Sequence, residues 1–120
     1  MEIGILGSGV VGRALAAGYA RHGHGVRIGT RQAQVEGVPS APPAEVVRGA
    51  DLVVIAVNGH VAVDLVLSVA TELEGKVLVD ATNPLEPSES RLYFTNRACD
   101  HVWRLPAQMK DDFARPEIAF

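Results

Sequence analysis

Residues 2–12 carry the sequence EIGILGSGVVG, in which a short apolar run passes directly into a glycine-rich turn. The apolar run at 2–6 predicts a β-strand. Over 10–21 the apolar residues recur at helical spacing, which predicts a helix. A strand, a glycine-rich turn and a helix in this order begin a βαβ unit. This stretch therefore favours an α/β fold with a parallel sheet.

The rest of the first 85 residues continues the alternation. We expect strands at 26–29, 52–57 and 76–80, helices at 43–48 and 60–73, and a weak strand near 35–38. The run LVVIAV at 52–57 is apolar throughout, which is typical of a strand buried on both faces. Strands that alternate with helices predict a doubly wound parallel sheet, the Rossmann type of α/β fold, in a single domain spanning 1–120.

Composition narrows the functional classes. The length of 120 residues suits one domain and leaves no room for a separate substrate domain. A net charge of −3 gives no electrostatic case for nucleic acid or an acidic membrane surface as a partner. Cys99 is the single cysteine, so no intrachain disulfide is possible, and the N-terminal residues lack the basic flank of a secretory signal. We expect a cytoplasmic protein without a membrane span.

The glycine-rich turn has the spacing GxGxxG and lies between a predicted strand and a predicted helix, the context that favours a dinucleotide site. The first glycine permits a tight turn, the second lets the backbone approach a diphosphate, and the third lets the helix pack closely. The alternative is a structural turn without a ligand. The candidate diphosphate-binding residues are Gly7, Ser8, Gly9, Val10, Val11 and Gly12.

The end of the second strand predicts which dinucleotide binds. An NAD site places an acidic residue there to hold the ribose 2′-hydroxyl. This chain has Thr30 and Arg31 instead, and its first acidic residue afterwards is Glu36. A hydroxyl and a guanidinium suit a 2′-phosphate, so we expect NADP(H). The alternative for Arg31 is a solvated loop cation.

Two further groups follow later strands, where open α/β sheets bind ligands. Candidate contacts to the diphosphate or the nicotinamide end of the cofactor are Val57, Asn58, His60, Thr82 and Asn83. Simple turn chemistry at Asn58-Gly59 and a stiff strand exit at Asn83-Pro84 are the alternatives. His22 and His24 have no nearby partners suited to a metal site, so no metal is expected. No set of catalytic side chains is visible, and the catalytic residues stay unknown.

Three segments together resemble a known family: GILGSGVVGRALAAGYARHGHGVRIGTR at 4–31, ADLVVIAV at 50–57 and VLVDATNPL at 77–85. Over residues 1–85 the chain resembles the NADP oxidoreductases that depend on coenzyme F420, a deazaflavin. The resemblance implies that residues 7–12 hold the diphosphate, that Thr30 and Arg31 hold the 2′-phosphate, and that the turns at 58 and 82–84 flank the nicotinamide. It implies hydride transfer between NADP(H) and a deazaflavin or flavin, chemistry that the cofactors carry.

Residues 86–120 contain no glycine and are expected to close the sheet. The chain is expected to stop short of the C-terminal helical segment that relatives use for the deazaflavin pocket and the dimer. A homodimer mate or a partner chain would then supply the acceptor side of an enzyme. Two alternatives stay open: a non-catalytic NADP(H)-sensing or cofactor-binding module, and the cofactor domain of another NADP-dependent reductase, of the pyrroline-carboxylate or hydroxyacid type.

Overall fold

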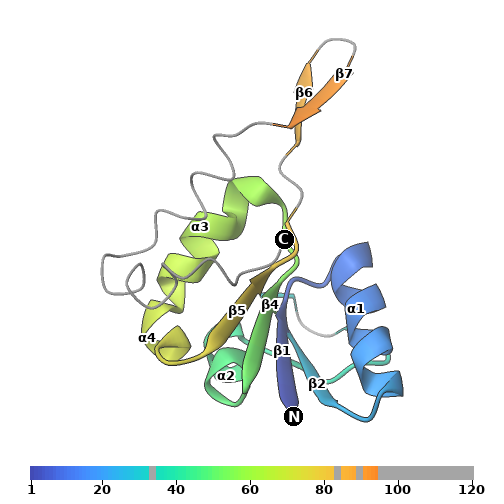
Figure 1. Cartoon of the computed structure of the whole chain (residues 1–120), viewed down its shortest axis with the longest axis vertical. Helices are drawn as coiled ribbons and strands as arrows, with labels where there is room; N and C mark the ends of the chain where they lie inside the picture. The colour runs from blue at the N-terminus through green and yellow to red at the C-terminus, as the bar shows by residue number, and fades with distance from the viewer. Residues whose placement is uncertain (33–34, 83–84, 89–90, 95–120) are drawn as a thin grey trace.

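Five parallel strands form one sheet in the order β3-β2-β1-β4-β5, with β1 at its centre (Figure 1). The computed structural model describes residues 1–32, 35–82, 85–88 and 91–94. The strands, in chain order, are β1 (Glu2–Leu6), β2 (Gly25–Gly29), β3 (Ser40–Ala41), β4 (Leu52–Ile55) and β5 (Val77–Asp80). This order is that of the Rossmann fold, so the predicted doubly wound α/β sheet is confirmed.

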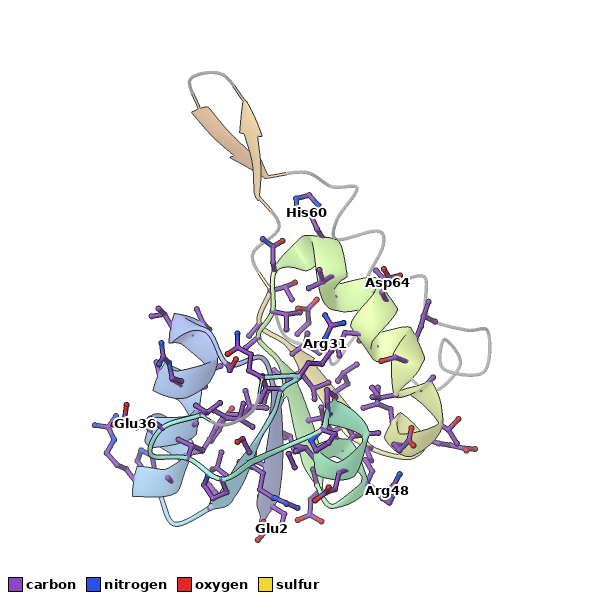
Figure 2. All side chains as sticks on the ribbon, turned by 180° about the vertical axis from the view of Figure 1, so that it is seen from behind. Glu2, Arg31, Glu36, Arg48, His60 and Asp64 are labelled. Carbon is purple, nitrogen blue, oxygen red and sulfur yellow. The ribbon has the colours of Figure 1, made fainter. Side chains whose placement is uncertain are left out.

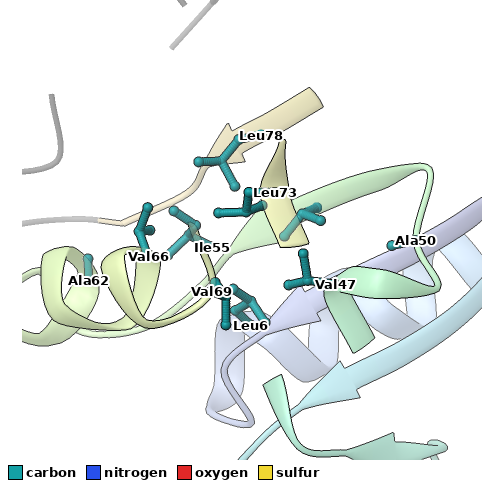
Figure 3. Close-up of a cluster of buried hydrophobic side chains, with 10 residues drawn as sticks. Leu6, Val47, Ala50, Ile55, Ala62, Val66, Val69, Leu73 and Leu78 are labelled. Atoms are coloured by element: carbon teal, nitrogen blue, oxygen red, sulfur yellow. The ribbon is translucent and has the colours of Figure 1, made fainter. Parts of the chain in front are cut away.

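Helices cover both faces of the sheet. They are α1 (Val10–Arg21), α2 (Pro43–Arg48), α3 (Gly59–Ser68) and α4 (Ala70–Leu73). Buried residues of α2, α3 and α4 pack with Leu6, Val53 and Ile55 on one face, the cluster drawn in Figure 3. On the other face, Ala16 of α1 packs with a second cluster that contains Val54 of β4. Successive residues of β4 thus enter opposite clusters, as expected for a strand buried on both faces.

Helix α2 lies close to β1 and β2 because glycines of both strands face it. A Cβ at Gly4 would lie 2.9 Å from Cγ1 of Val46, and one at Gly29 would lie 3.2 Å from Cα of Pro43. Side chains at these positions would push the helix away from the sheet. Because Gly29 is the last residue of β2, this packing also fixes where the chain leaves the sheet toward Thr30.

Two sequence predictions were wrong. The weak strand expected near 35–38 is absent, and the edge strand is β3 at Ser40–Ala41, paired with Ile28 and Gly29. Val35 and Val38 instead pack, partly buried, against the α1-side cluster. Their apolar character reflects this packing and not a strand. The helix expected over 60–73 is divided at Val69, whose φ of −122° and ψ of 18° lie outside helical geometry.

Beyond β5 the chain forms two short antiparallel strands, β6 (Leu85–Ser88) and β7 (Arg91–Phe94). They pair with each other and not with the five-stranded sheet. The sequence did not predict this hairpin. Of the segment expected to close the sheet, residues 89–90 and 95–120 lie outside the described residues. In the described part, no helix combines the length and the apolar character needed to cross a bilayer.

The cluster between the sheet and helices α2–α4 predicts a sharp difference between two leucines. Leu73 is 1% exposed within this cluster, whereas Leu67 on α3 is 46% exposed. We expect Leu73→Ala to lower the free energy of unfolding by about 2–5 kcal/mol, because it leaves a cavity. Leu67→Ala is the matched control and should change it by less than about 0.5 kcal/mol. Urea unfolding followed by circular dichroism measures both, and equal losses would contradict this packing.

Candidate functional site

The carboxyl ends of β1 and β4 form the point at which the chain changes direction across the sheet. From β1 the chain winds to β2 and β3, and it then crosses back to β4 and β5. In open α/β sheets, ligands bind in the crevice outside such strand ends. Helix α1 begins after β1 and α3 begins after β4, so both helix N-termini lie at this edge. Figure 2 shows Arg31 and His60 toward this end of the sheet, and Glu2 and Arg48 at the opposite end.

The three glycines of the β1–α1 turn meet three different constraints. Gly7 has a φ of +124°, and a Cβ there would collide with the carbonyl oxygen of Ala56. A Cβ at Gly12 would collide with the carbonyl oxygen of Gly7. Gly9 is different, because a Cβ there would have no neighbour within 4 Å among the described residues. Glycine at 7 and 12 is therefore required by the fold itself, whereas at Gly9 it leaves open space beside the backbone.

That open space lies at the N-terminus of α1. Gly9 is the N-cap residue, no side chain caps the helix, and its first turn holds no acidic residue. The first residues of the helix are exposed, with Val10 at 79% and Val11 at 53%. Backbone N–H groups at a helix start have no partner within the helix and carry a partial positive charge. This end of α1 can therefore receive an anionic group such as a phosphate.

Polar side chains gather where β2 ends. The N–H group of Thr30 donates to the carbonyl oxygen of Ala41 at 3.1 Å, which ties the strand end to β3. The Thr30 hydroxyl lies 3.3 Å from the hydroxyl of Ser8 and accepts from the N–H group of Gln32 at 3.1 Å. The structure thus brings the predicted residues Ser8 and Thr30 together. The sequence interpretation missed Gln32, although its position two residues after Thr30 at a strand end was a usable signal.

Arg31 is exposed beside this polar group. The two ion pairs found among the described residues are formed by Arg27 with Glu45 and by Arg48 with Glu72. Neither of them involves Arg31. Among the described residues, the side chains of Ser8 and Thr30 form hydrogen bonds with hydroxyl and amide groups and with none of the described carboxylates.

The β4–α3 turn is organised by a helix cap. The Asn58 side chain accepts a hydrogen bond from the N–H group of His60 at 3.0 Å and so caps α3. His60 is exposed, and Val57 is partly buried against the cluster of helices α2–α4. Of the two interpretations of Asn58, the structure shows the turn chemistry, while its exposed side chain still lies at the strand-end edge.

At the end of β5 the chain is held by two hydrogen bonds. The N–H group of Ala81 donates to the carbonyl oxygen of Ile55 at 2.9 Å, and that of Thr82 donates to the Asp80 carboxylate at 2.8 Å. These bonds place Thr82 beside the end of β4. Asn83 and Pro84, predicted to flank the nicotinamide, lie outside the described residues. Within the described ranges, no three His, Cys, Asp or Glu side chains gather as a metal site would require.

Comparison with known proteins adds a family match. Residues 2–84 match the family model described as NADP oxidoreductase, coenzyme F420-dependent. No curated protein was found to match the chain. Among solved structures, the chain is similar to a protein from Arthrobacter sp. FB24 provisionally designated an F420-dependent NADP reductase. That match has 36% identity and a TM-score of 0.69, over 78% of this chain and 50% of that one.

Two more distant structures share the fold. Pyrroline carboxylate reductase from Plasmodium falciparum, solved with NADP bound, is 22% identical with a TM-score of 0.63, over 69% of this chain and 34% of that one. An imine reductase from Streptomyces aurantiacus is 20% identical with a TM-score of 0.61, over 84% of this chain and 38% of that one. The chain thus spans half or less of the length of each of these proteins. Because the family model covers well over half of its residues, the chain belongs to the coenzyme F420-dependent NADP oxidoreductase family.

Proposed function

We propose that this chain binds NADP(H) at the carboxyl edge of its sheet and takes part in hydride transfer between NADP(H) and a deazaflavin or flavin. The observation that carries the proposal is the uncapped, exposed N-terminus of α1 with open space at Gly9. The family match supports the chemistry, and the residues at this edge support the cofactor.

The diphosphate fits the β1–α1 turn. Gly9 presents backbone where a side chain would otherwise stand, and the first-turn N–H groups of α1 point out of the helix toward the same place. Val10 and Val11 add donors from their backbone, while their exposed side chains line the surface next to the turn. Diphosphate bound here would be held by the helix dipole and by unpaired N–H groups.

The 2′-phosphate fits the end of β2. Thr30 offers a hydroxyl and Arg31 a guanidinium, which binds phosphate through paired, charge-assisted hydrogen bonds. Ser8 joins this end of the site to the diphosphate loop through its contact with Thr30. A ribose without the phosphate would find no carboxylate among these residues to accept from its hydroxyl.

The nicotinamide end falls between the starts of α1 and α3. NADP(H), when bound, supplies or accepts the hydride at its nicotinamide. The task of the protein is then to hold the ring in place. We assign that task to Asn58, His60 and Thr82 at this edge, and we keep Asn83, the next residue along the chain, as a candidate from the sequence. A second copy of the chain or a partner chain would complete the acceptor side, and we place the activity in the cytoplasm.

Turnover tests the proposed reaction. We expect the protein to oxidise NADPH in the presence of coenzyme F420, with FMN and FAD as comparison acceptors, and to do so faster than with NADH. The loss of NADPH absorbance measures the rate. Tight NADPH binding without turnover on any acceptor would instead support a non-catalytic cofactor-binding module. Oxidation of NADPH by a cyclic imine alone, or reduction of NADP+ by a hydroxyacid alone, would support a different reductase.

Arg31→Ala tests the assignment of the 2′-phosphate. Removing the guanidinium should weaken NADPH binding by ~1.5–3 kcal/mol, roughly ten- to a hundredfold, with little effect on NADH. Fluorescence titration with both nucleotides measures the difference. Arg48→Ala is the control, because Arg48 is an exposed arginine at the opposite end of the sheet (Figure 2). Equal weakening of both nucleotides by Arg31→Ala would contradict the assignment.

Two glycine substitutions separate the binding role of the turn from its structural role. Gly9→Ala fills space that is open in the described structure, so it should weaken NADPH binding while the unfolding free energy falls by less than about 1 kcal/mol. Gly12→Ala collides with the Gly7 carbonyl oxygen, so it should cost about 1–3 kcal/mol of stability or more. Calorimetric binding and thermal unfolding measure the two effects. A Gly9→Ala protein with unchanged affinity would refute the diphosphate placement.

A further inference from the structure

We propose that Gln32 is an additional determinant of NADP(H) specificity, and that its side-chain amide donates hydrogen bonds to the 2′-phosphate. This inference rests on the proposed function, and it concerns a residue outside the GxGxxG turn and the Thr30-Arg31 pair. Its basis is a chain of hydrogen bonds whose donors and acceptors can be ordered from the chemistry of the groups.

The chain of hydrogen bonds joins the two loops that follow β1 and β2. The hydroxyl of Ser8 lies 3.3 Å from the hydroxyl of Thr30 and 3.4 Å from Oε1 of Gln32. The backbone brings these loops together, because Leu6 pairs with Gly29 in the sheet and the N–H group of Gly7 donates to the Gly29 carbonyl oxygen at 3.1 Å. The proximity of the Ser8, Thr30 and Gln32 side chains therefore depends on the pairing of β1 with β2 as well as on the conformation of the two loops.

The direction of each hydrogen bond follows from the number of protons available. Oε1 of Gln32 is a carbonyl oxygen and can only accept, so the Ser8 hydroxyl donates to it. Ser8 has a single hydroxyl proton, so Thr30 must be the donor in the contact between the two hydroxyls. The Thr30 oxygen in turn accepts from the N–H group of Gln32. The order of donation therefore runs from Thr30 to Ser8 to the amide of Gln32.

This order determines what Gln32 offers to a ligand. With Oε1 engaged by Ser8, the amide nitrogen Nε2 provides two N–H donors and no acceptor. Gln32 is exposed, and it lies immediately after Arg31 at the end of β2. A phosphate dianion provides acceptors and no donor, which matches Nε2. Hydrogen bonds to a charged acceptor are roughly twice as strong as those between neutral groups, so Gln32 favours a 2′-phosphate over a 2′-hydroxyl.

The test isolates the adenosine end of the cofactor. Adenosine 2′,5′-bisphosphate carries the 2′-phosphate and AMP lacks it, so calorimetric titration of the full chain with both ligands reports the specificity without any turnover. Gln32→Glu is the sharpest variant, because its carboxylate can still accept from Ser8 but replaces the outward donors by a like charge. Gln32→Ala removes the amide, and Glu36→Ala is the control on the same connecting segment, where Glu36 is exposed.

We expect Gln32→Ala to weaken binding of the bisphosphate by roughly tenfold and Gln32→Glu by roughly a hundredfold. AMP binding should change by less than about twofold in both variants, and Glu36→Ala should bind both ligands as the wild type does. In a double-mutant cycle, Ser8→Ala and Gln32→Ala should lose less together than the sum of their separate losses, because Ser8 acts partly by orienting Gln32.

Two results would overturn the inference, and they are distinguishable from failure of the proposed function. A wild type that prefers the bisphosphate, combined with Gln32 variants that keep this preference, refutes the role of Gln32 and leaves NADP(H) binding intact. Equal weakening of bisphosphate and AMP binding refutes it as well, because the amide would then act on the loop and not on the phosphate. A wild type that shows no preference for the bisphosphate refutes NADP(H) specificity itself.

Discussion

The turn between β1 and α1 is held by backbone contacts with the end of β2, with the residue after β4 and with α1 itself. The geometry of the candidate site depends on these contacts. The N–H group of Gly7 donates a hydrogen bond to the carbonyl oxygen of Gly29 at the end of β2, and a Cβ at Gly7 would collide with the carbonyl oxygen of Ala56 just beyond β4. At Gly12, the third residue of α1, a Cβ would collide with the carbonyl oxygen of Gly7. No side chain fits at either position. The start of α1 is therefore fixed beside the ends of these strands, and its first N–H groups, which have no partner within the helix, lie at the carboxyl edge of the sheet.

The two ends of the sheet differ in how their polar groups are hydrogen-bonded. At the amino end, the N–H group of Glu2 donates to the Asp51 carboxylate at 2.8 Å, and Lys76 donates to the carbonyl oxygen of Ala50 at 2.8 Å. These groups satisfy one another and hold the strand starts together. At the carboxyl end, the start of α1 has no capping side chain. The first N–H groups of α1, which have no partner within the helix, are thus available at the carboxyl edge for an anionic group.

Local sequence signals were sufficient where one physical cause dominated. The apolar run at 52–55 is explained by burial on both faces of the sheet, so β4 could be predicted. The glycine spacing at 7–12 is explained by close backbone contact, so the turn to α1 could be predicted as well. The Val35–Val38 segment shows the opposite case. Its valines are apolar because they cover the sheet face beside α1 and not because they pair as a strand. Apolar character reports burial, and it does not say which element is buried.

What the sequence by itself determined is the alternation of strands and helices as far as β5, the family, and the residue types at the strand ends, because these depend on local periodicity and on short motifs. Only the tertiary structure decided which of these residues meet. Ser8 is 22 residues from Thr30 and 24 residues from Gln32 along the chain, and the pairing of β1 with β2 brings their loops together. The tertiary structure likewise shows that the side-chain oxygen of Asn58 accepts the hydrogen bond that caps α3. Contacts of this kind depend on pairing between distant segments, which no local pattern records.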